Sequence, residues 1–100
     1  SAVSRKQEYK TTLIKKGVSI GANATIVCGN TLHEFAFIGA GAVVTKDVPA
    51  YALIVGNPGK RVGWMSEYGH KLKFDADNKA VCPETKQEYI LENNWVRKIK

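Results

Sequence analysis

The sequence predicts a mainly β protein built around a parallel β-helix, and the main evidence is a six-residue repeat in residues 14–48. Every sixth position is aliphatic, in the order Ile14, Ile20, Ile26, Leu32, Ile38 and Val44. Four positions after each of these lie Val18, Ala24, Asn30, Ala36, Ala42 and Val48, and all but Asn30 are apolar. A helix repeats its apolar residues about every 3.6 positions and a flat strand every second position, so neither explains the pattern. In a β-helix each hexad forms a short strand and a corner, and stacked coils bury one continuous column.

A family resemblance lies in residues 12–62, which read TLIKKGVSIGANATIVCGNTLHEFAFIGAGAVVTKDVPAYALIVGNPGKRV. This segment resembles the C-terminal coils of the hexapeptide-repeat acyltransferases, and residues 38–60 carry the most specific part of the match. In that family the β-helix is left-handed and three hexads form one triangular coil. The resemblance therefore implies a left-handed β-helix of about two coils within residues 11–57. At a strand spacing of about 4.8 Å, such a stack is only ~10 Å tall.

The segments on either side of the repeat are expected to differ from it. Residues 1–10 are expected to be a lead-in or a truncated coil. An uncapped coil would expose the edges of its strands to aggregation. We expect a carboxy-terminal fragment or a chain that relies on partner subunits; the alternative is a short natural protein capped by these polar residues. Residues 58–70 predict a capping helix, with Asn57 as N-cap, Pro58 at its first position and Gly69 as its stop. Residues 71–100 predict a small antiparallel β-meander, with a turn at 75–78 and strands near 79–82, 88–91 and 95–99.

The tail narrows the resemblance. Residues 63–72 read GWMSEYGHKL, and residues 71–89 read KLKFDADNKAVCPETKQEY. Together they resemble a tail found in bacterial N-acetyltransferases. Those enzymes acetylate the 3-amino group of UDP-2-acetamido-3-amino-2,3-dideoxy-glucuronate and related nucleotide sugars. The resemblance implies a cytoplasmic, homotrimeric, acetyl-CoA-dependent N-acetyltransferase that acts on a UDP-linked amino sugar for surface polysaccharide, including lipopolysaccharide. The competing hypothesis is a non-catalytic trimeric β-helix that assembles or binds. Neither the sugar nor the catalytic base follows from the sequence.

Five candidate coenzyme-binding residues follow from the motifs of the family. The backbone can approach a ligand closely where side chains are small, as at Gly21-Ala22 and Gly39-Ala40-Gly41. By resemblance, Ala22 and Ala40 contact the pantetheine arm, Thr45 and Lys46 the adenosine end, and Lys60 the phosphates. The alternative is that the glycines only turn corners and that the lysines are solvated.

We expect different roles for His33, His70 and Asn30. Imidazole suits proton removal near neutral pH, but the family's catalytic histidine lies in an earlier coil. The base therefore stays unassigned, and His33 is the candidate within this chain. His70 is expected to be a cap or surface group. Asn30 either bonds backbone within its own corner or faces a groove between subunits.

Composition argues against several other classes. The net charge of +6 suits a phosphate-bearing partner, but the basic residues are dispersed and no nucleic-acid motif accompanies them. Two histidines are too few for the three zinc ligands of a γ-class carbonic anhydrase, so no metal is expected. Cys28 and Cys82 fit free thiols in a reducing cytoplasm. No apolar run is long enough to span a membrane.

Overall fold

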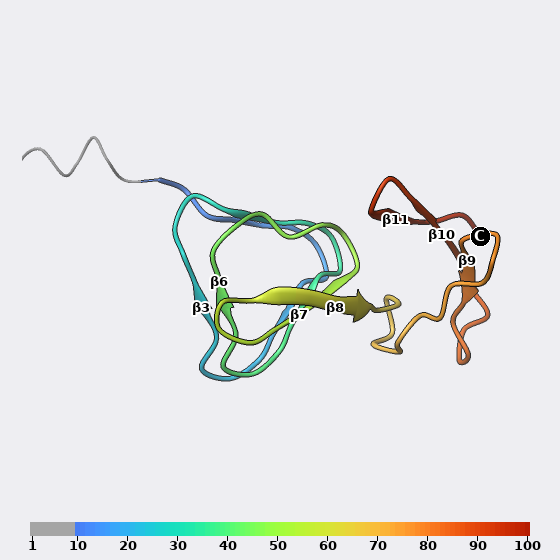
Figure 1. Cartoon of the computed structure of the whole chain (residues 1–100), viewed down its shortest axis with the longest axis horizontal. Helices are drawn as coiled ribbons and strands as arrows, with labels where there is room; N and C mark the ends of the chain where they lie inside the picture. The colour runs from blue at the N-terminus through green and yellow to red at the C-terminus, as the bar shows by residue number, and fades with distance from the viewer. Residues whose placement is uncertain (1–9) are drawn as a thin grey trace, which may run out of the picture.

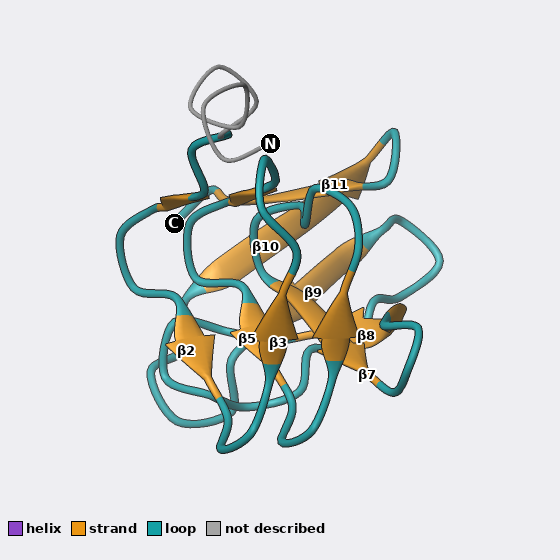
Figure 2. Cartoon of the chain, turned by 90° about the vertical axis from the view of Figure 1, so that its left-hand side faces the viewer, coloured by secondary structure: helices purple, strands orange, loops and turns teal. Residues whose placement is uncertain are grey.

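The computed structural model describes residues 10–100 and contains strands but no helix in that range (Figures 1 and 2). The expected lead-in at residues 1–10 falls, apart from Lys10, outside the described residues. Six two-residue strands come first: β1 (Leu13–Ile14), β2 (Ser19–Ile20), β3 (Thr25–Ile26), β4 (Thr31–Leu32), β5 (Phe37–Ile38) and β6 (Val43–Val44). Five longer strands follow: β7 (Ala52–Val55), β8 (Lys60–Trp64), β9 (Lys79–Val81), β10 (Glu88–Glu92) and β11 (Trp95–Lys98).

The first six strands form the two predicted coils. β1 pairs with β4, β2 with β5 and β3 with β6, all in parallel. Ile14 lies beside Leu32, 18 residues later, so one coil consists of three hexads. The three ladders are the three faces of a triangular prism, and Figure 1 shows its turns nearly superposed.

The predicted aliphatic column fills the inside of this prism. Leu32 and Ile38 of the second coil are 0% exposed. The equivalent residues of the first coil, Ile14 and Ile20, are 54% and 43% exposed. The column is therefore closed toward the end of the repeat and open at the first coil.

The expected capping helix at residues 58–70 is wrong, because a β-hairpin occupies the start of this segment. β7 continues the coil by pairing in parallel with β5, and β8 then pairs antiparallel with β7. On the next face, the N–H of Val43 donates to the carbonyl of Gly56 at 2.9 Å, and Gly59 donates to the carbonyl of Val43 at 2.7 Å. An open strand edge needs backbone partners. A helix cannot supply them, because it uses its own backbone groups internally.

The uneven exposure of side chains along β8 comes from a β-bulge. Val62 is 52% exposed, whereas Trp64 is buried and only 6% exposed. Leu53 pairs with Gly63 and Ile54 with Arg61, so Val62 has no partner on β7 and is the extra residue of a β-bulge, with its side chain exposed.

The tail is a three-stranded antiparallel sheet in the order β11-β10-β9, close to the three predicted strand ranges. The turn at residues 75–78 is present: the Asp75 carboxylate accepts hydrogen bonds from the N–H groups of Asp77 and Lys79 at 2.8 and 3.0 Å. The tail shares one apolar cluster with the prism, since Tyr89 packs edge-on against Tyr51 with ring centroids 5.3 Å apart. Among the described residues there is no helix long and apolar enough to cross a membrane.

Candidate functional site

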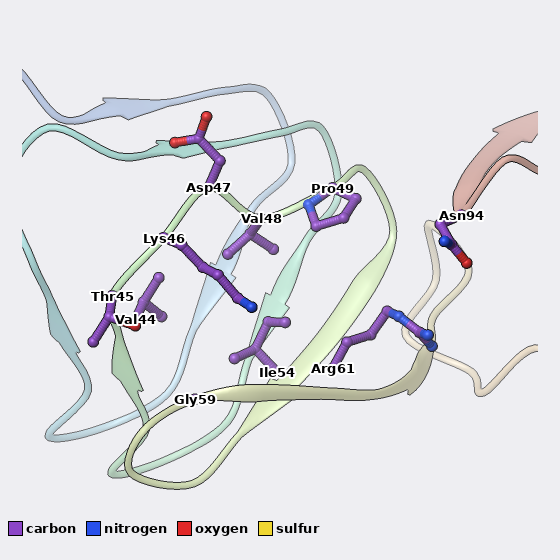
Figure 3. Close-up of a pocket in the computed structure, with 10 residues that line it drawn as sticks. All are labelled: Val44, Thr45, Lys46, Asp47, Val48, Pro49, Ile54, Gly59, Arg61 and Asn94. Atoms are coloured by element: carbon purple, nitrogen blue, oxygen red, sulfur yellow. The ribbon is translucent and has the colours of Figure 1, made fainter.

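A cavity of about 270 Å³ lies at the closed end of the column (Figure 3). Its apolar lining includes Val44, Val48 and Ile54, which belong to the last residues of the column. The other lining residues come from the corner after β6, from β8 and its turn, and from the tail; they are Thr45, Lys46, Asp47, Pro49, Gly59, Arg61 and Asn94. Three separate parts of the chain thus enclose one site.

Two cationic side chains enter this cavity above its apolar floor. Figure 3 shows Lys46 extending from its corner toward Ile54, with Arg61 on the opposite side. The Arg61 guanidinium lies 4.6 Å from the centre of the Trp64 ring, so stacking on a buried aromatic residue orients it. Neither cation belongs to the ion pairs found among residues 10–100. The cavity therefore offers positive charge to an anionic ligand.

The nearby acidic residue does not neutralise these cations directly. The Asp47 side chain is turned away from Lys46 in Figure 3, and its Oδ1 accepts a hydrogen bond from the N–H of Thr31 at 2.8 Å. This bond fixes the corner that carries Lys46 to the coil below. Asp47 thus stabilises the conformation of the corner.

The structure brings together two of the five candidate coenzyme-binding residues. Thr45 and Lys46 line the cavity, whereas Lys60, which is exposed and pairs through its strand with Val55, does not. Arg61 lines the cavity instead and was missed by sequence reasoning. Alternation along β8 could have separated the two side chains, but only if residues 60–64 had been recognised as a strand.

Ala22 and Ala40 lie at a different corner of the prism, after β2 and β5. Both are exposed, and the N–H of Gly41 donates to the carbonyl of Ala22 at 2.9 Å. A Cβ added to Gly21 would lie 2.5 Å from the backbone nitrogen of Ala40, so only glycine permits the two coils to stack this closely. The corner therefore presents backbone and small side chains to its surroundings.

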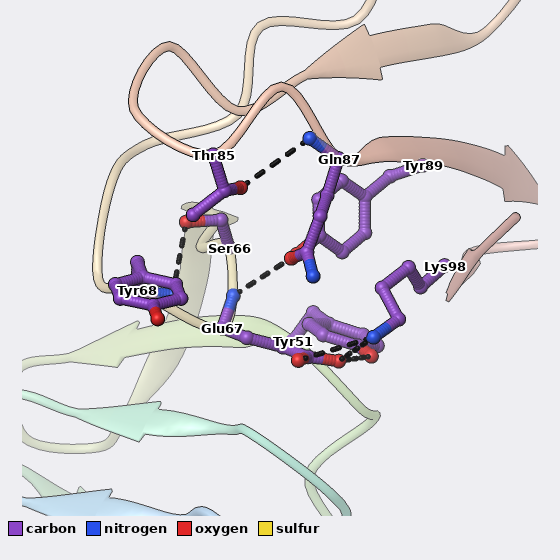
Figure 4. Close-up of polar contacts among 8 residues, drawn as sticks. All are labelled: Tyr51, Ser66, Glu67, Tyr68, Thr85, Gln87, Tyr89 and Lys98. Atoms are coloured by element: carbon purple, nitrogen blue, oxygen red, sulfur yellow. Dashed lines mark hydrogen bonds and ion pairs between the residues drawn. The ribbon is translucent and has the colours of Figure 1, made fainter. Parts of the chain in front are cut away.

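A second polar cluster joins the prism to the tail (Figure 4). The Tyr51 hydroxyl donates to Oε2 of Glu67 at 2.9 Å, and the Lys98 ammonium lies 3.2 Å from the same oxygen. The N–H of Glu67 donates to the Tyr89 hydroxyl at 3.1 Å. Burial, and then the hydrogen bond to Glu67, raise the pKa of Tyr51 well above its usual range. Burial also raises the pKa of Tyr89. The two phenols are thus held neutral as hydrogen-bonding groups of this joint.

The two cysteines are free thiols in different surroundings. Cys28 is exposed and Cys82 is buried. Burial opposes ionisation of Cys82, but hydrogen bonds with Ser66, Thr85 and backbone groups outweigh it and lower the pKa of the thiol to about 7. Because Cys82 has no exposed surface, its thiol is part of the packing between the tail and the segment at Ser66. No group of three or more potential metal ligands occurs among the described residues.

The remaining candidates of the sequence have structural contacts. His33 packs edge-on against Trp95 of the tail, with ring centroids 5.0 Å apart. His70 lies 3.1 Å from the Glu84 carboxylate, near the surface. The Asn30 side-chain amide donates to the carbonyl of Val27 at 2.8 Å, which agrees with the local alternative for this residue.

Comparison with known proteins agrees with this architecture, although no protein-family model matches the chain. The chain is 51% identical over 76 residues to dTDP-3-amino-3,6-dideoxy-alpha-D-galactopyranose 3-N-acetyltransferase of Aneurinibacillus thermoaerophilus. That match covers 76% of this chain and 39% of the relative, so the chain spans about two fifths of the relative's length.

Two solved structures share the fold. Serine acetyltransferase of Neisseria gonorrhoeae matches with a TM-score of 0.54 and 44% identity, over 55% of this chain and 22% of the other. A hexapeptide-repeat acetyltransferase of Vibrio cholerae, solved with acetyl coenzyme A, matches with a TM-score of 0.55 and 32% identity, over 57% of this chain and 31% of the other. The fold is mainly β and similar to that of the left-handed β-helix acetyltransferases. From its repeat, its stacked coils and these relatives, the chain belongs to the hexapeptide-repeat acetyltransferase family.

Proposed function

We propose that this chain forms the coenzyme-binding part of an acetyl-CoA-dependent N-acetyltransferase whose acceptor is a nucleotide-linked 3-amino sugar. The observation that carries the proposal is the 51% identity, over 76 residues, to an enzyme named for the 3-N-acetylation of a dTDP-linked amino sugar. The resemblance of the tail favours a UDP-linked sugar, so the acceptor is proposed as a nucleoside-diphosphate-linked 3-amino sugar. Its product would serve surface polysaccharide synthesis in the cytoplasm.

The cavity at the end of the prism suits the nucleotide end of coenzyme A. Lys46 and Arg61 supply positive charge for phosphates, and arginine adds a planar fork of donors that matches phosphate oxygens. A volume of about 270 Å³ is just below the ~300–1,000 Å³ of whole-ligand pockets. The site is therefore proposed to hold one end of the coenzyme, while the pantetheine arm lies outside it.

The corner at Ala22 and Ala40 is proposed to contact that arm. Because it is separated from the corner at Thr45 and Lys46 by one face of the prism, one chain does not gather both sets of residues into a single cavity. Packing of chains around a threefold axis would place a corner of one copy beside a different corner of its neighbour. This geometry supports the proposal of a homotrimer with the coenzyme in the groove between copies.

The proposed reaction needs positioning more than covalent catalysis. The amine nitrogen of the sugar attacks the thioester carbonyl carbon, and a base takes one proton from that nitrogen. The C–S bond then breaks, and coenzyme A leaves as a thiolate that accepts this proton to become the free thiol. His33 packs against Trp95, and we assign it no part in proton transfer. The base is left unassigned.

The test is a segment exchange with the Aneurinibacillus relative. The 76 matched residues of that enzyme are replaced by those of this chain, and acetyl transfer to its named dTDP-linked amino sugar is followed by release of free thiol. We expect activity to be retained, and we expect Arg61→Ala in the exchanged segment to raise the KM for acetyl-CoA. A trimer that folds, binds no coenzyme A and transfers no acetyl group would favour the non-catalytic assembly module instead.

A further inference from the structure

We propose that Asn94 recognises the adenine ring of the coenzyme, so that the β10–β11 hairpin of the tail completes the nucleotide end of the site. This inference rests on the proposed function and adds a residue and a base specificity to it. It assigns the tail a role in ligand recognition, whereas the prism supplies the positive charge.

The first observation is that the hairpin holds Asn94 in a defined place. Glu92 pairs with Trp95, which leaves a two-residue turn of Asn93 and Asn94. Their φ angles are +53° and +59°, as in the type I′ turns that favour asparagine and glycine. Trp95 packs against His33 of the prism, and the next residue, Val96, is fully buried. The tip of the hairpin is thus anchored on the prism.

The second observation is that only one of these two asparagines lines the cavity. Asn94 lines it together with Arg61, and Figure 3 shows both on the same side, across from Lys46. Turn geometry alone explains why asparagine suits both positions. Turn geometry does not explain why the Asn94 amide lines a cavity that also holds two cations. Among residues 10–100, the Asn94 side chain forms no hydrogen bond to another protein group.

The chemistry of the amide then selects the ligand. An asparagine side chain carries one acceptor and one donor side by side, which match the N6 amino group and the N7 nitrogen of adenine. Val48, Pro49 and Ile54 provide an apolar surface for a planar ring, and Lys46 and Arg61 lie within reach of phosphates attached to the ribose. An adenine nucleotide therefore satisfies the amide, the apolar floor and both cations.

The test uses two nucleotides that differ at the recognised edge, adenosine 3′,5′-bisphosphate and inosine 3′,5′-bisphosphate. Calorimetry compares their binding to the full chain, to Asn94→Gly and to the matched control Asn93→Gly. Glycine tolerates positive φ, so both variants keep the turn while each loses one side chain. We expect the full chain to prefer adenosine by about three- to tenfold, the size of a hydrogen bond between neutral groups. Asn93→Gly should keep that preference and Asn94→Gly should abolish it.

The outcomes separate the inference from the function on which it rests. If the full chain binds coenzyme A and both bisphosphates, and Asn94→Gly leaves the preference unchanged, the inference fails and the proposed function stands. Equal weakening of both nucleotides in Asn94→Gly would also overturn it, because the amide would then not read the base. If the full chain binds neither coenzyme A nor the bisphosphates, both proposals fail.

Discussion

Replacing Ile38 by Ala removes three buried carbon atoms from the middle of the aliphatic column. Ile38 is fully buried, and its strand lies between β2 and β7. The lost transfer free energy is about 0.8 kcal/mol for each buried methylene-sized group. The enclosed cavity adds to this loss, and measured core truncations of this kind cost about 2–5 kcal/mol. We expect a loss of about 3–4 kcal/mol in the free energy of unfolding.

The matched control is Ile20→Ala, which makes the same change in the same column one coil earlier. Ile20 is 43% exposed, so less apolar surface is lost and no enclosed cavity forms. We expect a cost of about 1–1.5 kcal/mol. Urea unfolding followed by the fluorescence of Trp64 and Trp95 measures both variants at equal chain concentration. We expect the slope of the free energy of unfolding against urea concentration to be the same in both. Equal losses for the two variants would refute the stacking that places Ile38 inside a closed column.

The remaining predictions concern the corners, the joint and the cavity. Gly21→Ala forces two coils apart and should cost about 1–3 kcal/mol in urea unfolding, more than Gly63→Ala, where an added Cβ comes no closer than 3.8 Å to a residue other than its chain neighbours. Burial and the neighbouring carboxylate raise the pKa of Tyr51, so its neutral form stabilises the fold below about pH 10, and this contribution is lost as pH rises further. In urea unfolding above pH 10, the free energy of unfolding of Tyr51→Phe should therefore depend less on pH than that of the parent chain. Lys46→Ala and Arg61→Ala should each weaken coenzyme A binding by about 0.5–2 kcal/mol in calorimetry, and unchanged affinity in both would remove the cationic role of the cavity.

The repeated part of the fold could be predicted from sequence because its signal is periodic. The column from Ile14 to Val44 recurs every six residues, and the structure pairs residues 18 apart as three hexads per coil require. The glycines of the corners follow from the same stacking. Residue spacing in a solenoid thus determines which side chains are buried together, with no long-range information needed.

The structure that follows the repeat could not be predicted from residue spacing. Asn57 and Pro58 look like a helix start in isolation, but the open edges of β5 and β6 demand strand-like partners. The need for backbone hydrogen-bond partners arises only in the folded coil, so the local sequence does not reveal it. Arg61 was missed for the same reason, whereas Lys60 was expected from the motif of the family. Asn94 was missed because only the folded tail brings it to the cavity.

The most direct test of the account is the affinity of this chain for coenzyme A compared with pantetheine, measured by calorimetry at low and at high salt. If Lys46 and Arg61 bind the phosphates, coenzyme A should bind at least about tenfold more tightly than pantetheine, a difference of about 1.4 kcal/mol. Added salt should narrow the difference by screening those charges. Equal affinity for the two molecules at low salt would contradict the assignment of the cavity to the nucleotide end of the coenzyme.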